Sequence, residues 1–446
     1  MQASGWEAES RSTRVAAGLL IGLLAAFLVV VGMLTPWHPL PGADVDTAPI
    51  HHFFTQPQIN RSQAFFDADR WPSWLGLLAG LIVAAVLAFS VIGHRAVSLV
   101  RLHIPLWWLQ VITLVTAVSV IETAATAPFG LWSAQLGRDY GLSTQSLGGW
   151  AVDRMKALLL GVAVASMLLL ALIGLARRFT RAWFVPAAVG AGVLVVVFSF
   201  SYPIVVEPLF SRFAPLPPGP LRTQLLQLAH RDGVNVSDVL VVDASRRTTA
   251  LNAYVSGFGT TKRIVIYDTL LKSVPDKEIN VIVAHELGHA KSGDVVIGTL
   301  EGALAASAGI VALFLLLRPR LLRKQVDAGS VGDPAIVPVV MGLAVLVSFA
   351  ALPIQDTLSR HVEARADAHC LQLTHDPSDF ISLQQRLAVT NLDHLQPNGF
   401  LSFWFNNHPP TLDRIGMALA WERLHGPGVT PSSDWIHSGS GAADGG

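Results

Sequence analysis

Two histidines four residues apart, with a glutamate between them, carry the most specific chemistry in this chain. They lie in the stretch VIVAHELGHAKSGDVVIG, residues 281–298, as His285, Glu286 and His289. In a helix, residues i and i+4 share a face, so both imidazoles can point at one metal ion while Glu286 reaches its bound water. The pattern predicts a catalytic zinc site with Glu286 as general base. The alternative is a pair of hydrogen-bonded helix histidines.

A catalytic zinc usually has three protein ligands, so a third must come from another segment. The stretch LSRHVEARADAHCLQLT, residues 358–374, puts Glu363 and Asp367 four apart on one helix face. Glu363 is the predicted ligand, and Asp367 is predicted to orient a ligating histidine through its other ring nitrogen. His361 and His369 compete with Glu363, but neither shares a face with both acids. The alternative for Glu363 is a solvated carboxylate paired with an arginine.

The composition is that of a membrane protein. Charged residues make up 14% of the 446 and hydrophobic residues 52%, whereas soluble proteins have roughly 25% charged residues. A span needs about 20 helical residues to cross the hydrocarbon layer. Five uncharged apolar stretches are this long, and two more contain one acid each, Glu122 and Glu301. We therefore predict seven spans, at residues 15–35, 71–93, 104–131, 157–176, 182–206, 295–317 and 334–355.

Other counts narrow the function classes. Cys370 is the only cysteine, so an intrachain disulfide or a cysteine metal cage is excluded. The net charge is zero and there is no basic block, which leaves nucleic-acid binding without support. The first span is longer than the apolar core of a signal peptide, and we interpret it as a retained anchor.

The predicted fold class is a mainly α-helical integral membrane protein with a small α+β zinc metalloprotease domain. We divide the chain into a membrane region with five spans, a soluble insertion, spans six and seven, the C-terminal part of the catalytic domain, and a Gly/Ser-rich disordered tail. The corresponding ranges are residues 1–206, 207–294, 295–355, 356–424 and 425–446.

The soluble insertion contains mixed secondary-structure signals. The prolines of PLFSRFAPLPPGP are expected to block regular pairing. LRTQLLQLAHRDG predicts a helix that stops at Gly233. VLVVDAS and KRIVIYDTLL predict strands, and NAYVSGFGTTK between them predicts a strand and turn that complete a hairpin.

The zinc ligands lie close to the predicted spans along the chain. His289 precedes Val295 by six residues, and Glu363 follows Gln355 by eight. If both helices are continuous, the zinc lies ~9 Å from span six and ~12 Å from span seven. Both ligand helices are then extensions of transmembrane helices, and the metal lies at the bilayer surface. A protease of this kind would cut substrates that are held at the membrane.

Taken together, these motifs resemble the type I CAAX prenyl protease family of membrane zinc metallopeptidases. The similarity extends from about Phe53 to Leu424. It implies a ring of seven transmembrane helices around a large chamber. The matching stretches are YGLSTQSLGGWAVDRMKALLL, PLFSRFAPLPPGPLR, NAYVSGFGTTKRIVIYDTLL, HELGHAKSGD, LSRHVEARAD and HPPTLDRI.

The resemblance assigns roles at the metal. It implies that His285, His289 and Glu363 bind Zn²⁺, that Glu286 is the general base, and that Asp367 supports the site. The implied chemistry is hydrolysis by a metal-activated water.

The resemblance also assigns residues that face the substrate. These are Asn252 and Tyr254 of NAY, His408 of HPP, and Arg414, with Asn252 and His408 also catalytic. An exposed strand at Asn252 can pair with an extended peptide, and His408 can stabilise an oxyanion. The alternatives are a turn residue for Asn252 and a structural cap for His408.

The expected function is that of a zinc endopeptidase acting on peptides or membrane-associated proteins, possibly prenylated ones, since family members remove C-terminal tripeptides from prenylated proteins. The expected location is the bilayer of the plasma membrane. One alternative is a membrane quality-control metalloprotease, although those enzymes usually have fewer spans. Another is a receptor or transport protein with a structural zinc site, against which the presence of Glu286 argues.

Two features remain open. Glu122 and Glu301 face either a wet interior or the membrane interface. Arginine-rich loops at 95–101, 177–181 and 318–324 place the zinc site outside the cytoplasm by the positive-inside rule. The family's members, by contrast, present the site to the cytosol.

Overall fold

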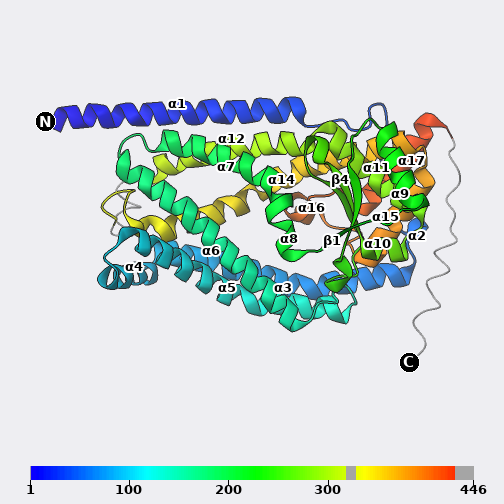
Figure 1. Cartoon of the computed structure of the whole chain (residues 1–446), viewed down its shortest axis with the longest axis horizontal. Coiled ribbons are helices and arrows are strands. Elements are labelled where there is room, and N and C mark those ends of the chain that lie inside the picture. The colour runs from blue at the N-terminus through cyan, green and yellow to red at the C-terminus, as the bar shows by residue number, and fades with distance from the viewer. Residues whose placement is uncertain (1, 318–327, 427–446) are drawn as a thin grey trace.

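Seven long apolar helices run along the longest axis of the molecule (Figure 1). The computed structural model describes residues 2–317 and 328–426, and each of these seven helices is long and apolar enough to cross a membrane. The prediction of seven spans is confirmed, and the chain is a multi-pass integral membrane protein. The helices are α1 (Gln2–Leu34), α3 (Gln56–Phe89), α5 (Trp107–Asp139), α6 (Leu147–Arg178), α7 (Phe184–Val205), α12 (Asp294–Leu317) and α14 (Val337–Thr374).

The membrane helices keep large apolar side chains on their outer surface. Ile82, Leu159 and Val189 are 59 to 64% exposed, which an aqueous environment would penalise and a hydrocarbon environment favours. Within the bundle, α7 packs on α12, α12 on α1, α6 on α5, α5 on α3, and α3 on α14.

Glu122 and Glu301, the two acids within the predicted spans, line cavities between helices. Glu301 lines a cavity of about 830 Å³ bordered by α1, α12 and α14. Glu122 lines one of about 500 Å³ bordered by α3, α5 and α14. The carboxylates therefore have open space between helices, as an acid within a membrane requires.

The second span differs from its predicted bounds of residues 71–93. Helix α3 begins at Gln56 and ends at Phe89, and a separate helix, α4 (Val91–His103), follows. Ser90 is extended and its side chain accepts a hydrogen bond from the backbone N–H of Ile92. The turn is tight, because a Cβ on Gly93 would lie 1.9 Å from the carbonyl oxygen of Leu87. The apolar run crosses this turn, so hydropathy alone did not reveal it.

A four-stranded sheet lies beside the membrane helices, with the order β1-β2-β4-β3. Its strands are β1 (Phe213–Pro215), β2 (Asp238–Val242), β3 (Ala253–Ser256) and β4 (Arg263–Tyr267). Strands β3 and β4 form the predicted antiparallel hairpin. Strands β2 and β4 are parallel.

The expectation that the prolines of PLFSRFAPLPPGP block pairing is wrong, because this stretch contains β1. Strand β1 pairs with β2 in antiparallel fashion, with Pro215 opposite Leu240. Because β1 is an edge strand, the missing N–H of proline is tolerated.

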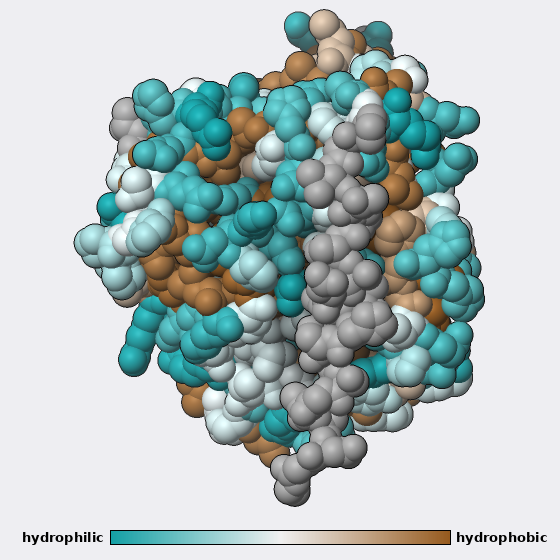
Figure 2. All heavy atoms as spheres, turned by 90° about the vertical axis from the view of Figure 1, so that its right-hand side faces the viewer, coloured by the Kyte–Doolittle hydropathy of each residue, from teal (hydrophilic) through white to brown (hydrophobic). Residues whose placement is uncertain are grey.

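Shorter helices complete the water-exposed end of the molecule. They are α2 (Ile50–Phe53), α8 (Glu207–Phe210), α9 (Pro220–Arg231), α10 (Asp268–Ser273), α11 (Asp276–Ser292), α15 (Pro377–Asn391), α16 (Gly399–Phe405) and α17 (Thr411–His425). One hydrophobic core joins α9, α11, α15, α17 and the sheet. Figure 2 shows this end with mainly hydrophilic side chains and apolar patches between them. His425 belongs to α17, and residues 427–446 of the predicted tail lie outside the described residues.

The two ligand-bearing helices relate to the membrane differently from each other. Helix α14 is continuous from Val337 to Thr374 and carries Glu363, as predicted. Helix α11, however, ends at Ser292 and is not continuous with α12. Gly293 adopts the left-handed region with φ of 71°, and Asp294 begins α12. Glycine enters this region without the penalty of a Cβ, so the chain turns here.

Candidate active site

Helix α11 holds the two histidines in a largely buried segment. Its first turn carries Asp276 and Glu278, which interact favourably with the positive end of the helix dipole. Further along, the ring centroids of His285 and His289 are 4.8 Å apart, and their Nε2 atoms are 3.1 Å apart. The four-residue spacing thus brings both imidazoles to one point.

Glu363 of α14 approaches the same point from the side. Its Oε2 lies 3.2 Å from Nε2 of His285, and its Oε1 lies 3.6 Å from Nε2 of His289. One ligand atom from each of the three residues lies within 4.8 Å of the other two. Oε2 of Glu363 is buried and accepts no hydrogen bond within the described part of the chain. Two imidazole nitrogens and an unsatisfied carboxylate oxygen fit a divalent metal such as zinc.

An aspartate from another helix stands behind each histidine. Nδ1 of His285 lies 2.8 Å from Oδ1 of Asp367 on α14. Nδ1 of His289 lies 2.8 Å from Oδ2 of Asp294 at the start of α12. An acceptor at Nδ1 fixes the ring orientation and leaves Nε2 for the metal.

Each of these aspartates is paired with an arginine. Arg414 of α17 donates to both oxygens of Asp367, at 2.8 and 2.5 Å, and Arg365 of α14 donates to Asp294. Asp367 is fully buried, so its charge requires a bidentate partner of this kind. The resemblance assigns Arg414 to substrate binding. In the structure Arg414 also fixes the position of Asp367, the aspartate at Nδ1 of His285.

Glu286 is directed into a cavity beside the histidines. The cavity has a volume of about 550 Å³, and α11, α15, α17 and the segments before β3 and α17 form its wall. Burial raises the pKa of Glu286, and the neighbouring histidines and the nearby backbone N–H of Val255 on β3 act in the opposite direction. The carboxylate is thus placed between the metal position and the edge strand.

His408 and Asn252 lie on the same cavity. Nε2 of His408 is 3.3 Å from Oε2 of Glu363, and its side chain is 53% exposed. Asn252 is exposed and immediately precedes β3. Strand β3 ends the sheet, with β4 as its neighbour. The structure therefore brings both residues to the cavity with Glu286.

The structure separates Tyr254 from this group. Its ring packs with Val242, Ala244 and Val265 on another face of the sheet, and Tyr254 is not among the cavity residues. Side chains alternate along a strand, so Tyr254 points away from the face that its neighbours Ala253 and Val255 present to the core around α11. The predicted substrate contact of Tyr254 has no support in this geometry.

The two competing histidines have other partners. Nδ1 of His361 is 2.9 Å from the carbonyl oxygen of Thr357. Nε2 of His369 is 3.0 Å from Asp232. Neither belongs to the cluster of metal-binding atoms that the described residues form.

Two sequence families match successive parts of the chain. Peptidase family M48 matches residues 215–422. The family described as CAAX prenyl protease N-terminal, five membrane helices, matches residues 48–212. The chain belongs to peptidase family M48. It is a metalloprotease, and membership of a metallopeptidase family implies a catalytic metal ion.

Similar proteins cover most of this M48 metalloprotease. It is 29% identical to "Uncharacterized metalloprotease YhfN" of Bacillus subtilis, over 90% of this chain and 95% of that protein. It is 26% identical to CAAX prenyl protease 1 of Saccharomyces cerevisiae, over 73% of this chain and 77% of the relative. The fold is that of S. mikatae Ste24p, whose crystal structure matches with a TM-score of 0.74 at 20% identity, covering 91% of this chain and 99% of that one.

Asp294 and Arg365 are site residues of the M48 metalloprotease that were not predicted from the sequence. Both lie within the matched motifs HELGHAKSGD and LSRHVEARAD. Asp294 follows His289 by five residues, a spacing that puts the two on different faces of a continuous helix. The break at Gly293 is what returns Asp294 to His289. The Gly293-Asp294 pair, four and five residues after His289, was the available signal.

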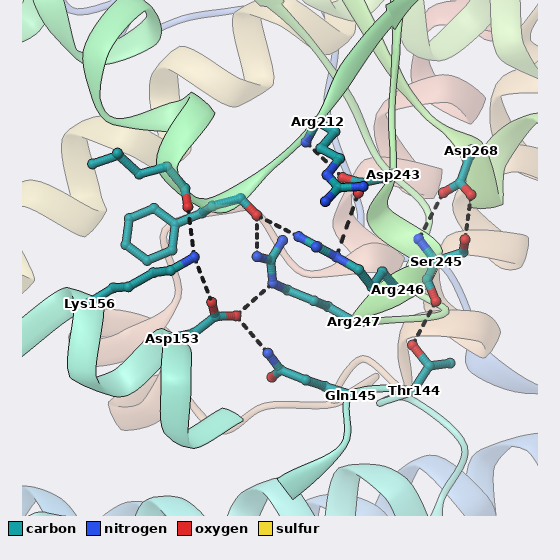
Figure 3. A network of polar contacts seen from close by, with 12 residues as sticks. Thr144, Gln145, Asp153, Lys156, Arg212, Asp243, Ser245, Arg246, Arg247 and Asp268 are labelled. Carbon is teal, nitrogen blue, oxygen red and sulfur yellow. Dashed lines mark hydrogen bonds and ion pairs between the residues drawn. The ribbon is translucent and has the colours of Figure 1, made fainter. Parts of the chain in front are cut away.

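A polar network attaches the segment before β3 to the membrane helix α6 (Figure 3). Asp153 of α6 accepts hydrogen bonds from Arg247 at 2.9 Å and from Gln145 at 2.7 Å. Arg247 also donates to the carbonyl oxygen of Phe210, and Thr144 donates to that of Ser245 at 2.8 Å. These hydrogen bonds attach the segment that precedes Asn252 to the membrane region of the M48 metalloprotease.

Proposed function

We propose that this M48 metalloprotease binds zinc through His285, His289 and Glu363 and uses it to hydrolyse peptide bonds. The observation that carries the proposal is the convergence of their ligand atoms within 4.8 Å. Both histidines have an aspartate at Nδ1, as zinc-binding histidines usually do. The chemistry that zinc supplies when bound is Lewis-acid activation of water and of the scissile carbonyl.

Glu286 acts as general base in this proposal. Its carboxylate accepts a proton from the attacking water and delivers it to the leaving amine nitrogen. Burial, which raises its pKa, increases its affinity for that proton compared with an exposed glutamate. Water is the nucleophile, so no covalent enzyme intermediate forms.

The substrate binds along β3 in the proposed complex. An extended peptide can add to a sheet edge by backbone hydrogen bonds, and β3 is such an edge next to α11. Asn252 contacts the peptide at the start of the strand. His408 donates to the oxygen that becomes negatively charged as the carbonyl is attacked.

We infer that the substrates are peptides or proteins held at the membrane, including the C-terminal segments of prenylated proteins. The similarity to proteins named CAAX prenyl protease 1 supports this substrate class. Seven candidate spans favour it over a quality-control protease with fewer spans. We place the enzyme in the plasma membrane.

The test uses purified full-length protein and quenched peptides that end in a CAAX sequence, with and without a prenyl group. We expect cleavage that a chelator abolishes and that one equivalent of zinc restores. Cleavage that continues after the metal has been removed to below a tenth of an equivalent would contradict the zinc mechanism. Equal rates for prenylated and unprenylated peptides would contradict selection of the prenyl group.

A further inference from the structure

The active-site cavity contains an acid that the proposed mechanism does not use. The described residues that line it include two carboxylates, Glu286 and Asp393. Glu286 has the role of general base. Asp393 follows the end of α15 and lies in the part of the wall that Thr411 and Arg414 of α17 complete.

The backbone of Asp393 is fixed, whereas its carboxylate has little support. Its N–H donates to the carbonyl oxygen of Ala388 at 3.0 Å, and its own carbonyl oxygen accepts a hydrogen bond from Ser62. Among the described residues, the carboxylate accepts one long hydrogen bond, 3.4 Å from the hydroxyl of Thr411. The next residue is also held, because the ring of His394 stacks on Phe66 at 3.8 Å.

The buried Glu278 of α11 shows how this chain satisfies a carboxylate with a cation of its own. Both oxygens of Glu278 accept hydrogen bonds from Arg386, at 2.7 and 3.0 Å. Asp393 lies near one cation, Arg414, but Nε and Nη2 of that guanidinium donate to Asp367, and the hydrogen bond that the Asp393 carboxylate accepts among the described residues comes from Thr411. Burial raises the pKa of Asp393 to about 6, and Arg414 only partly offsets this effect.

The charges of the site leave Asp393 without a partner of its own. Arg414 neutralises Asp367, and a divalent metal ion at the proposed site would be matched by Glu363 and Glu286. A buried carboxylate without a matching cation is unfavourable. A cationic group entering the cavity would remove this cost, so charge complementarity favours a positively charged ligand.

We propose that Asp393 is a specificity residue that receives a lysine or arginine side chain of the substrate, close to the scissile bond. This inference rests on the proposed peptidase function of the same cavity. The enzyme then prefers peptides with a cationic residue at one position and disfavours peptides with an acid there.

The experiment uses full-length protein in nanodiscs and a set of quenched peptides. The peptides differ at one position, which carries Lys, Gln or Glu. Separate groups of three peptides test each position on both sides of the scissile bond in turn. At one position we expect kcat/KM for Lys to exceed that for Gln by about tenfold, and Glu to be the poorest of the three. Asp393→Asn should reduce the Lys-to-Gln ratio to about one.

Asp67→Asn is the matched control. Asp67 is a half-exposed acid near His394 that forms a surface ion pair with Arg70, and it does not line the cavity. This variant should keep the wild-type ratio. If the wild-type Lys-to-Gln ratio of kcat/KM is below two at every position, the inference is overturned, and this result does not depend on whether Asp393→Asn folds. A folded Asp393→Asn variant that keeps the wild-type ratio also overturns it. Wild-type protein that cleaves none of the peptides contradicts the proposed function itself.

Discussion

Nδ1 of His289 lies 2.8 Å from Oδ2 of Asp294, although His289 belongs to the last turns of α11 and Asp294 begins the membrane helix α12. Gly293 between the two helices makes the contact possible by turning the chain with φ of 71°. Arg365 of α14 pairs with the other oxygen of Asp294. One carboxylate thus connects the metal site to two membrane helices.

Asp294→Asn should weaken zinc binding. The amide can still contact Nδ1 but is a weaker acceptor, and it leaves Arg365 without its charge partner. We expect the zinc dissociation constant to rise roughly 10- to 100-fold, measured by competition with a chromogenic chelator. Asp276→Asn, at an exposed acid in the first turn of α11, should leave it unchanged. Equal affinities for Asp294→Asn and wild type would show that Asp294 does not orient His289.

Arg414→Gln should destabilise the fold strongly, because it leaves the fully buried carboxylate of Asp367 without its cation. The expected loss is about 3 kcal/mol of unfolding free energy, seen as a lower midpoint of thermal unfolding in tryptophan fluorescence. Arg70→Gln, which removes an exposed ion pair with Asp67, should cost less than about 1 kcal/mol. The double variant Asp367→Asn/Arg414→Gln should recover part of the loss. If Arg414→Gln and Arg70→Gln unfold at the same midpoint, the Asp367–Arg414 pair does not stabilise the fold more than the exposed pair does.

The proposed metal-binding residues were accessible to sequence reasoning because the geometry within each helix is local. His285 and His289 on one helix, and Glu363 and Asp367 on another, follow from the helical repeat alone. The seven spans follow from hydropathy because each needs only a long apolar run. The hairpin of β3 and β4 follows from two apolar segments around a Gly-rich turn.

Features that depend on backbone turns or on long-range packing could not be predicted from the sequence. The helix break at Gly293 brings Asp294 to the site, and the turn at Ser90 ends α3. Neither turn was predicted from the sequence. The face to which Tyr254 points depends on the register of β3 against β4. Asp393 lines the same cavity as Glu286 only because α15, α17 and α11 surround that cavity.

The preference for a cationic substrate should disappear at low pH. Burial raises the pKa of Asp393 to about 6, so its charged form predominates above that pH and is lost as the pH falls through it. Arg414 stays charged, and burial lowers the pKa of the adjacent His394, which keeps that ring neutral near pH 7. The Lys-to-Gln ratio of kcat/KM should fall toward one between pH 7.5 and about pH 5. Titration of Glu286 changes kcat/KM for both peptides equally, so it does not affect their ratio. A constant ratio across this range would contradict the role of Asp393.

Charge distribution predicts that the active site lies outside the cytoplasm. The structure supports one part of this reasoning, because Arg101 of α4 contacts Asp333 and Arg177 of α6 contacts Gly332 at the same end of the bundle. The native Cys370 is buried, so Asp276→Cys and Arg178→Cys give clean reporters of the two ends. An impermeant maleimide should label position 276 in intact cells and position 178 only after permeabilisation. The reverse pattern would place the site in the cytosol.

The central claim is that Glu286 takes a proton from water at a zinc ion held by His285, His289 and Glu363. Its most direct test is Glu286→Gln, assayed together for zinc content by elemental analysis and for cleavage of a quenched peptide. We predict one equivalent of zinc, as in the wild type, and a loss of kcat of at least about a hundredfold. Cleavage at the wild-type rate by the zinc-loaded variant would contradict the account.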